Sequence, residues 1–458
     1  MHWYSWGAEA FRAAKKENKP VLLFVGYGGC SLCQVMANES FSDLQTAELM
    51  NRFFINIKVD KDERPDVDSV YQQALRHFGG QGGWPATLFL TPDSKPFFAG
   101  TYFPAVANVD AHGSHLSFRD VLWQVAGMWR QDGAGVYKTS AEAGESMQGL
   151  TASRSGAQTM PTEKIDELAE RLVSLIDSEN GGFGQGAKFH HAPVLALMWQ
   201  RACAKNHCAK NHGGEPNGES PGESPWRRKR LLAAGVRLTL DNMCQGGIFD
   251  HAGGGFFRYT TDRTWQNPLP EKSLTDNAQM LQVLTTVWQE TQNPLYKDRA
   301  EKTARWLVDE MQLGATENDQ EHKGGFAALM TPSIGRNKKV LAEANGHAIA
   351  ALAQAGAVFV QPDWRTAAEQ AFNAVIRTHS DEDGALYHSW DAGGLCKMSP
   401  GKLSVAEDYA AMAHAALTLY ETTLYETQQA GNQQELLEKA QMWLYRLMQH
   451  HEDTQKGG

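Results

Sequence analysis

Two cysteines separated by two residues follow directly after an apolar segment near the start of the chain. Val21–Gly26 reads Val-Leu-Leu-Phe-Val-Gly, an apolar run with the length of a buried strand. The turn residues Tyr27-Gly28-Gly29 come next, and Cys30-Ser31-Leu32-Cys33 opens a helical pattern. Unpaired backbone N–H groups and the helix dipole favour a thiolate at a helix N-terminus. The segment therefore predicts a strand, a turn and a helix that carries a redox-capable pair of thiols.

Strand and helix patterns alternate through residues 1–130. Helical patterns occur at 8–18, 65–78 and 118–130, and strand patterns at 21–26, 53–60, 86–90 and 96–103. Pro65 stands near the start of its helix, where its missing N–H costs nothing. This alternation predicts an α/β domain.

Beyond Met160, strand patterns nearly disappear and helical patterns recur. They lie at about 161–179, 192–205, 226–244, 273–291, 294–313, 342–359, 363–379, 405–427 and 433–450. Residues 131–160 are rich in Gly, Ala, Ser and Thr, which is typical of a linker or a partly helical connection. Residues 205–225 are rich in Gly, Pro, Asn and Glu and predict a mobile insert. We expect an α/β domain at 1–130, a linker at 131–160 and an all-α domain at 161–458.

A glycine motif recurs in the helical half. Gly181-Gly182-Phe183, Gly246-Gly247-Ile248 and Gly324-Gly325-Phe326 each follow a helical pattern, and Asp383-Gly384-Ala385 is a weaker copy. Glycine after a helix supplies a left-handed cap, and the next apolar side chain can fold back on the last turn. The spacing favours repeated helical hairpins with long loops on one face.

The composition excludes several classes of function. Lysine and arginine total 43 and aspartate and glutamate 53, which gives a formal net charge of −10. A general nucleic-acid-binding protein needs a basic face, so we expect no nucleic-acid partner. No stretch approaches the roughly 18 apolar residues that span a bilayer, and the N-terminus lacks the regions of a secretory signal. We expect a soluble, cytoplasmic protein with no membrane partner.

The cysteine pair carries the most specific chemistry. Cys30 is the predicted nucleophile, and Cys33, one helical turn later, resolves the mixed disulfide. Trp84-Pro85 directly precedes a predicted strand, where a cis peptide bond commonly forms one wall of a substrate groove. The alternative is that both cysteines are small buried apolar residues. A structural zinc site needs four nitrogen or sulfur ligands, and no second Cys/His pair stands at convincing spacing from Cys30 and Cys33. The other candidate ligands, Cys203, His207, Cys208 and His212, lie in or beside the expected insert, where a solvated loop is the alternative interpretation.

At these residues the sequence resembles an uncharacterised thioredoxin-domain family that includes spermatogenesis-associated protein twenty and bacterial relatives. The resemblance rests on Trp3-Tyr4-Ser5-Trp6, Ala10-Phe11, Gly26–Cys30, Val35-Met36, Glu39-Ser40-Phe41, Ile57–Asp60, Glu63–Asp66, Gly82–Pro85 and Gly100–Pro104. It continues more sparsely through Gly246–Asp250, Gly253–Tyr259 and Asp276-Asn277-Ala278 to Glu407-Asp408-Tyr409. The resemblance implies a thioredoxin-like N-terminal domain and an (α/α) six-hairpin toroid, complete or incomplete, similar to sugar epimerases and glycosidases.

The sequence also departs from the family in ways that bear on chemistry. Ser31, Leu32 and Gln34 stand where the family typically has histidines, and the strand at 21–26 has none of the carboxylates that many thioredoxins bury there. Glu39 or Asp60 is therefore the candidate for handling the proton of Cys33.

A carbohydrate site in the helical domain would need converging acids, bases and aromatic rings. The candidates in its loops and helix starts are Asp250, Arg258, Tyr259, Trp265, Glu271, Asp276, Glu407 and Asp408. Each also has a structural explanation: Asp250 can cap a turn, Glu407 suits a helix start, and a tryptophan is often part of a core.

Three functions stay open at this point. The first is a thiol–disulfide oxidoreductase whose partner is an unidentified protein thiol or disulfide. The second is a carbohydrate-processing or carbohydrate-binding protein in which the thioredoxin-like domain is a scaffold. The third is a non-catalytic interaction module. None of the three requires a metal or another cofactor, so we expect none.

Overall fold

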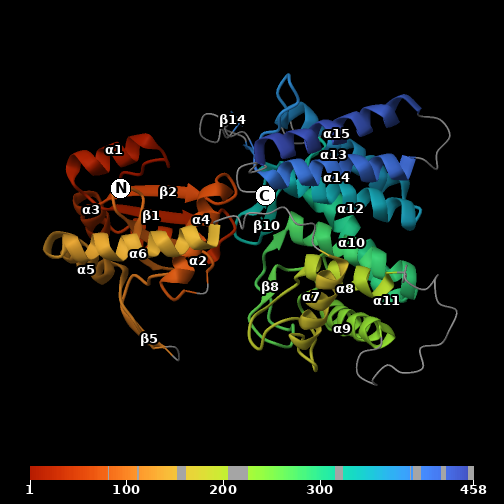
Figure 1. Ribbon diagram of the computed structural model, residues 1–458, viewed down its shortest axis with the longest axis horizontal. Helices are drawn as coiled ribbons and strands as arrows, with labels where there is room; N and C mark the ends of the chain where they lie inside the picture. The colour runs from red at the N-terminus through yellow and green to blue at the C-terminus, as the bar shows by residue number, and fades with distance from the viewer. Residues whose placement is uncertain are drawn as a thin grey trace. The chain divides into compact units, whose positions relative to one another are not determined.

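The computed structural model describes residues 1–80, 82–110, 113–151, 161–204, 225–314, 323–391, 394–395, 404–423 and 430–451. The chain divides into two compact units, the first consisting chiefly of Met1–Ser155 and the second of Gly156–Leu395 with Ala406–Glu452. Figure 1 shows the strands of the main sheet in the first unit and the long helical pairs in the second. Each unit is described by itself below.

A four-stranded sheet in the order β2-β1-β3-β4 organises the first unit. Its strands are β1 (Val21–Gly26), β2 (Ile55–Asp60), β3 (Ala86–Leu90) and β4 (Pro96–Gly100). The central strand β1 pairs in parallel with β2 and antiparallel with β3, while β3 and β4 form a hairpin. All of β1 is buried, because one face of the sheet carries Leu22 and Phe24 and the other Val21, Leu23 and Val25, each within its own core.

Helices cover both faces of this sheet. They are α1 (Ala8–Glu17), α2 (Ser31–Met36), α3 (Leu44–Phe53), α4 (Pro65–His77), α5 (Phe118–Gln131) and α6 (Gly133–Thr151), with a π-helical turn at Ala37–Phe41 and a small hairpin of β5 (Asn108–Asp110) and β6 (Gly113–His115). The α/β fold expected for this part of the chain is confirmed. Residues 133–151 of the expected linker form α6, and 152–160 lie outside the described residues.

Nine α-helices make up the described part of the second unit, each at a position where the sequence predicts one. They are α7 (Thr162–Ser174), α8 (Ala192–Cys203), α9 (Pro225–Gln245), α10 (Leu274–Thr291), α11 (Pro294–Trp306), α12 (Ala342–Val358), α13 (Pro362–His379), α14 (Ala406–Thr423) and α15 (Ala430–His451). Only short strands join them, so the expected change from an α/β to an all-α fold is confirmed. Within these described residues, no helix is both long and apolar enough to cross a bilayer.

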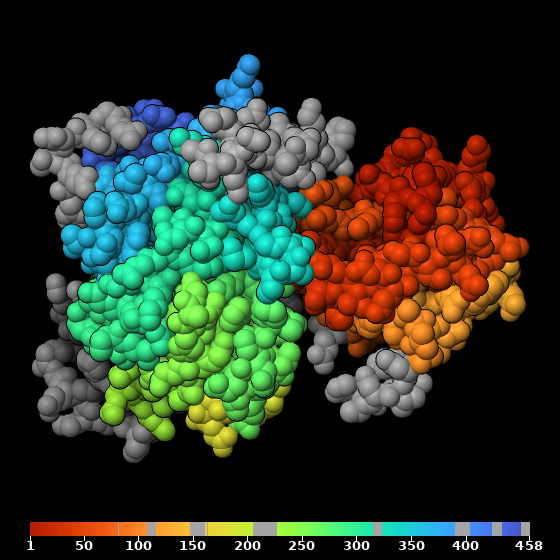
Figure 2. Space-filling view, turned by 180° about the vertical axis from the view of Figure 1, so that it is seen from behind, coloured from red at the N-terminus to blue at the C-terminus, as the bar shows by residue number. Residues whose placement is uncertain are grey.

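The helices form consecutive hairpins with an inner and an outer layer. Helices α8, α10, α12 and α14 pack against one another in turn, and each also packs against the helix that follows it in the chain. Figure 1 shows the hairpins stacked in chain order from α9 to α15, and the surface colours of this unit in Figure 2 follow the same order from yellow to blue. This two-layer arrangement is the one expected of an (α/α) toroid-like domain.

The repeated glycine motif closes one loop in each hairpin. A short β-bridge follows the outer helix in four places: Ile176↔Phe183, Phe249↔Phe256, Gln312↔Phe326 and Ser380↔Leu386. The second copy differs from the sequence expectation, because Gly254 and Gly255, with φ values of 77° and 76°, occupy the place assigned to Gly246 and Gly247. A Cβ on Gly254 would lie 2.6 Å from the carbonyl oxygen of Lys302, so this close approach requires glycine.

A buried asparagine joins each of two inner helices to the preceding loop. Asn277 of α10 accepts from the N–H of Phe256 (2.6 Å) and donates to the carbonyls of Phe256 (3.0 Å) and Ser273 (2.9 Å). Asn345 of α12 makes the equivalent three bonds, to both backbone groups of Phe326 and to the carbonyl of Leu341. Both asparagines are fully buried. Each amide therefore satisfies backbone groups that no solvent reaches.

We expect Asn277→Ala to lower the free energy of unfolding of the helical unit by about 3 kcal/mol, because it leaves the buried N–H and C=O of Phe256 unpaired. Urea titration followed by circular dichroism measures this change. Gln289→Ala, on an exposed position of the same helix, is the matched control and should change stability by less than about 0.5 kcal/mol. Equal effects of the two substitutions would contradict the role of Asn277.

Candidate functional site

The cysteine pair lies where the central strand of the sheet gives way to a helix. Strand β1 ends at Gly26, and Cys30 is the N-cap of α2 with an extended backbone. The Sγ of Cys30 accepts a hydrogen bond from the backbone N–H of Cys33 at 3.1 Å. The two cysteines form a disulfide with their Cα atoms 5.2 Å apart. The strand–turn–helix geometry thus places the first sulfur at a helix N-terminus.

Both sulfurs are largely covered by the surrounding protein. Cys30 is 4% exposed and Cys33 is 7% exposed, and both belong to one core cluster of the sheet. A Cβ on Gly26 would lie only 2.8 Å from the Sγ of Cys33. The end of β1 therefore has to be glycine for Cys33 to pack against it.

Two aromatic side chains stand beside the disulfide on neighbouring segments. Tyr27 follows β1 and Trp84 precedes β3, and their rings meet edge to face with centroids 5.7 Å apart. The Trp84–Pro85 peptide bond is cis. Because Val25 pairs with Ala86, Pro85 lies next to the end of β1. The predicted groove residues Trp84 and Pro85 are thus on the segment adjacent to the cysteine turn.

Helix α4 holds this segment in place. The indole N–H of Trp84 donates to the Oδ1 of Asp68 at 2.9 Å. The Gln72 amide accepts from the N–H of Gly83 (2.9 Å) and donates to its carbonyl (3.1 Å). These bonds fix the Trp84 side chain and the backbone before it from the same helix.

Lys61 is a residue of this site that sequence reasoning missed. Its Nζ lies 4.6 Å from the centre of the Tyr27 ring and 5.0 Å from that of the Trp84 ring, within cation–π distance of both. Its backbone N–H donates to the carbonyl of Gly26, and its ammonium also pairs with Asp62 at 2.6 Å. No positive charge lies within five residues of Cys30 in the sequence, but parallel pairing of β1 with β2 brings this one to the same edge of the sheet.

A cavity of about 210 Å³ lies beside Cys33. Its lining includes Cys33, Gln34, Lys58 and Asp60. Of the two carboxylates proposed for proton handling, Asp60 thus shares a cavity with Cys33. Glu39 is exposed and does not line this cavity. Burial, and to a smaller extent the negative charge of Glu39, raises the pKa of Tyr102.

The residues proposed for a carbohydrate site make polar and ring contacts, and three of them lie near one another, because the charges of Glu271 and Arg258 act on the Tyr259 hydroxyl. Arg258 pairs with Glu271 at 2.6 Å, and Asp250 with Lys272 at 2.7 Å. The ring of Tyr259 stacks on Phe189 with centroids 4.8 Å apart. Burial acts to raise the pKa of Asp250, but hydrogen bonds from Gly253 and Lys272 lower it overall.

The remaining members of that set also make structural contacts. Asp276 completes the N-terminal cap of α10 by accepting from the hydroxyl of Ser273 at 2.7 Å, and Trp265 is fully buried with its N–H bonded to the carbonyl of Asn180. Asp408 is fully buried and contacts Nδ1 of His388 at 2.9 Å, whereas the neighbouring Glu407 is exposed. The structure therefore gives most of these residues a role in holding loops and helix starts.

The Asp250–Lys272 pair has a counterpart one repeat earlier. Lys188 donates to the buried carboxylate of Asp177 at 2.8 Å and to the carbonyl of Gly181, as Lys272 does to Asp250 and Gly254. Hydrogen bonds from Arg263, and then from Lys188, hold the pKa of Asp177 well below its usual range against the effect of burial. Because the same lysine–aspartate pair occurs in two repeats, it indicates a contact that stabilises the loops of the fold.

The described residues contain no group of three or more His, Cys, Asp or Glu side chains that is arranged to hold a metal ion. His207, Cys208 and His212 of the zinc interpretation lie outside the described residues.

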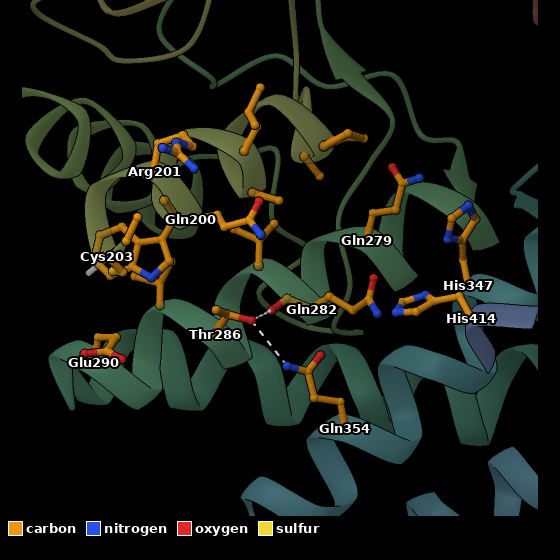
Figure 3. Close-up of a pocket in the computed structure, with 18 residues that line it drawn as sticks. Gln200, Arg201, Cys203, Gln279, Gln282, Thr286, Glu290, His347, Gln354 and His414 are labelled. Carbon is orange, nitrogen blue, oxygen red and sulfur yellow. Dashed lines mark hydrogen bonds between the residues drawn. The ribbon is translucent and has the colours of Figure 1, made fainter. Parts of the chain in front are cut away.

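A second set that sequence reasoning missed lies on the inner helices of the other unit. Figure 3 shows Gln279, Gln282 and Thr286 of α10 with His347 and Gln354 of α12 around one pocket. The sequence feature that could have indicated this set is a row of polar residues at helical spacing on helices that are otherwise apolar and buried.

Comparison with known proteins finds a family model that matches the N-terminal part of the chain. Residues 1–148 match a thioredoxin-like family model described as "Protein of unknown function, DUF255". The chain is 37% identical over 281 residues to uncharacterised protein B0495.5 of Caenorhabditis elegans, covering 61% of this chain and 35% of that protein. It is 33% identical over 317 residues to spermatogenesis-associated protein 20 of Homo sapiens, covering 67% and 37% respectively. The family resemblance is confirmed, and the chain spans little more than a third of these relatives' length.

Solved structures similar to the chain include sugar-modifying enzymes. A D-mannose isomerase has a TM-score of 0.46 at 13% identity and covers 66% of this chain and 75% of its own. Cellobiose 2-epimerase from Bacillus thermoamylovorans has a TM-score of 0.44 at 12% identity, with coverages of 62% and 73%. Scores at this level give no argument about substrate.

We expect Gly26→Ala to destabilise the oxidised protein by about 1–3 kcal/mol, because the new methyl group collides with the Sγ of Cys33. Thermal unfolding without reductant measures the effect. Gly127→Ala in α5, where a Cβ meets no atom within 4 Å, is the control and should be neutral or slightly stabilising. A Gly26→Ala protein as stable as the parent would contradict the close packing described here.

Proposed function

We propose, from the geometry of the cysteine pair, that the protein is a thiol–disulfide oxidoreductase; the match of residues 1–148 to a thioredoxin-like family model supports this proposal. One observation carries this proposal: Cys30 caps a helix and is bonded to Cys33 one turn later, beside the Trp84–Pro85 segment. The cap supplies N–H groups to a thiolate at Cys30, and the spacing lets Cys33 displace whatever Cys30 has bound.

The reaction in the reducing direction has two steps. The Cys30 thiolate attacks a substrate disulfide, forms a mixed disulfide with one substrate sulfur and releases the other as a thiolate. Cys33 then loses its proton and attacks the Sγ of Cys30, which forms the Cys30–Cys33 bond and releases the second substrate thiolate. Two electrons pass to the substrate, and a dithiol reductant must return them to the enzyme.

Cys30 is only 4% exposed, so a partner disulfide can reach it only through this small accessible area. We propose that the partner disulfide enters beside Tyr27 and Trp84, where Lys61 lies against both rings. A partner with carboxylates next to its disulfide would complement this lysine.

We further propose that Asp60 accepts the proton of Cys33, because both residues line the same cavity. A water in that cavity can connect the carboxylate with the thiol without direct contact.

A cytoplasmic location is part of this proposal, because the reductant is available there. Cys203 is exposed and remains a free thiol, and Cys244 is a free buried thiol, which suits a reducing compartment. The helical unit supplies a binding surface for a partner or substrate. The rival proposal of a carbohydrate-processing enzyme has less support, because the acids proposed for it hold loops and helix starts.

We expect Cys30→Ser to abolish the acceleration that the protein gives to the reduction of insulin disulfides by dithiothreitol, since the nucleophile at the helix N-cap is lost. Cys33→Ser should form a mixed disulfide that accumulates and is visible by mass spectrometry. Cys203→Ser removes an exposed cysteine outside this site and should keep full activity. A parent protein without activity, or a Cys30→Ser variant with full activity, would sink the oxidoreductase proposal and leave the non-catalytic interaction module.

We expect Asp60→Asn to slow the resolving step by about 10- to 100-fold, because the acceptor for the Cys33 proton is lost. Single-turnover decay of the mixed disulfide, followed as a function of pH, measures this step. The loss should shrink as the pH rises, because Cys33 then ionises without help. Glu39→Gln is the matched control and should decay like the parent; a slow Glu39→Gln variant beside a normal Asp60→Asn would exchange the two roles.

A further inference from the structure

A groove of about 620 Å³ lies between helices α3 and α5 of the first unit. One side of it is a face of α3 from Gln45 to Arg52, and the other is the start of α5 from Ser117 to Trp123. The loop at 105–107 completes the lining. Neither cysteine of the Cys30–Cys33 pair lines this groove, so it is a separate place on the same unit.

Large apolar side chains along this groove are open to solvent. Trp123 of α5 is 51% exposed, and Val106 in the loop is 74% exposed. Leu44 and Leu116, which stand next to the lining at the starts of α3 and α5, are also exposed. Exposed apolar side chains that gather in one place indicate an interaction surface.

Two guanidinium groups lie against one aromatic ring beside these apolar side chains. The Cζ of Arg52 is 5.1 Å and that of Arg130 is 4.2 Å from the centre of the Phe53 ring. The ring of Trp123 lies 5.3 Å from the same centre. Within the part of the chain that the structure describes, neither arginine forms an ion pair with a carboxylate. A carboxylate placed between these two like charges would relieve their repulsion.

The acids that line the groove do not neutralise these arginines. Asp120 is held in the cap of α5, where it accepts from the hydroxyl of Ser117 at 2.6 Å. Glu48 stands four residues before Arg52 on α3, but the two form no ion pair among the described residues.

Arg119 is a third arginine of this surface and is partly neutralised. It donates to the Oε1 of Gln45 at 2.6 Å between the two helices. Hydrogen bonds from Thr46, and then the charge of Arg119, lower the pKa of Asp43, so this arginine lies near a carboxylate. The positive charge that lacks a counterpart is therefore at Arg52 and Arg130.

A glycine leaves the helix bare between the exposed ring and one of these arginines. Gly127 lies four residues after Trp123 and three before Arg130, which places all three on one face of α5. A Cβ at Gly127 would meet no atom within 4 Å, so the packing of the chain does not require glycine there. Glycine inside a helix costs about 0.5–1 kcal/mol relative to alanine. The bare backbone gives another chain room to approach α5 closely.

From the two unpaired arginines, the exposed Trp123 ring and the bare helix at Gly127, we propose that this α3–α5 surface binds an acidic, amphipathic segment of a partner protein. Carboxylates of the segment pair with Arg52 and Arg130, and its apolar side chains cover Trp123 and Val106. The surface is independent of the redox chemistry proposed for the cysteine pair.

A helical segment of about 12 residues fits this surface in length and in charge. Such a helix is about 18 Å long, close to the span of α5 from its start to Arg130. Amphipathic helices bind between two helices by their apolar face. Glu48 and Asp120 repel a continuous polyanion such as a nucleic acid, whereas carboxylates separated by apolar side chains can avoid them.

The probe is a fluorescein-labelled amphipathic peptide of about 12 residues with glutamate on one face and leucine on the other. Fluorescence anisotropy measures its binding to the whole chain. We expect micromolar binding that weakens at least about fivefold when sodium chloride is raised from about 0.05 to 0.5 M. The same peptide with lysine in place of glutamate should bind at least about tenfold more weakly. Cys30→Ser should bind the glutamate peptide like the parent, which separates this result from the oxidoreductase activity.

Substitutions on the two helices locate the peptide. Arg52→Gln and Arg130→Gln should each weaken binding about 3- to 10-fold, whereas Arg12→Gln, an equal change of charge on α1 at the other face of the sheet, should not. Gly127→Gln should weaken binding at least about tenfold without loss of thermal stability, because the new side chain covers the bare helix. Glu48→Gln should tighten binding about two- to threefold, because it removes a like charge.

Equal binding of the lysine peptide overturns the proposal, as does tighter binding of a single-stranded oligonucleotide of the same length. A benzophenone on the leucine face of the peptide should cross-link to α3, α5 or the loop at 105–107, and mass spectrometry that places the cross-link elsewhere overturns it too. Self-association of the chain that Gly127→Gln abolishes, without any peptide binding, assigns the surface to a second copy of this chain and also overturns the proposal.

Discussion

The pairing of β1 with its two neighbours fixes the candidate redox site. Gly26 pairs with Asp60 and Val25 with Ala86, so the ends of three segments far apart in sequence meet at one edge of the sheet. Cys30 follows the first end, Lys61 the second, and Pro85 precedes the third. Both faces of β1 are buried, each in its own core, so a shift of one residue in either ladder would exchange side chains of different size between the two cores and disturb the packing of both.

The parts of this site that are local in sequence could be predicted, and those that depend on strand pairing could not. Cys30 and Cys33 were predictable because a buried strand, two glycines and a helical pattern stand together in the chain. The contact of Lys61 with Tyr27 and Trp84 arises only from the parallel ladder. Likewise, sequence offered both Glu39 and Asp60 near Cys33, and only the three-dimensional arrangement distinguishes them.

In the helical unit, hydrophobic periodicity predicted the helices but not the chemistry of their loops. Polar residues in the loops suggested a catalytic set, whereas Asp250, Asp276 and Asp408 bond to Lys272, Ser273 and His388. The sequence predicts the second copy of the glycine motif at Gly246, eight residues before Gly254, because two groups of adjacent glycines follow the same helix and only the positive φ values identify Gly254 and Gly255. The polar row on α10 that includes Gln279 and Gln282 could not be recognised as part of a pocket from the sequence, because glutamines are common on the exposed faces of helices.

The asparagines at the starts of α10 and α12 have a consequence for how the hairpins tolerate change. Each amide bonds both backbone groups of one loop residue, Phe256 or Phe326, and so holds that residue at a fixed distance from the first turn of its helix. A substitution that displaces Phe256 or Phe326 should therefore also displace the start of α10 or α12, and the loops and the inner helices respond as one unit.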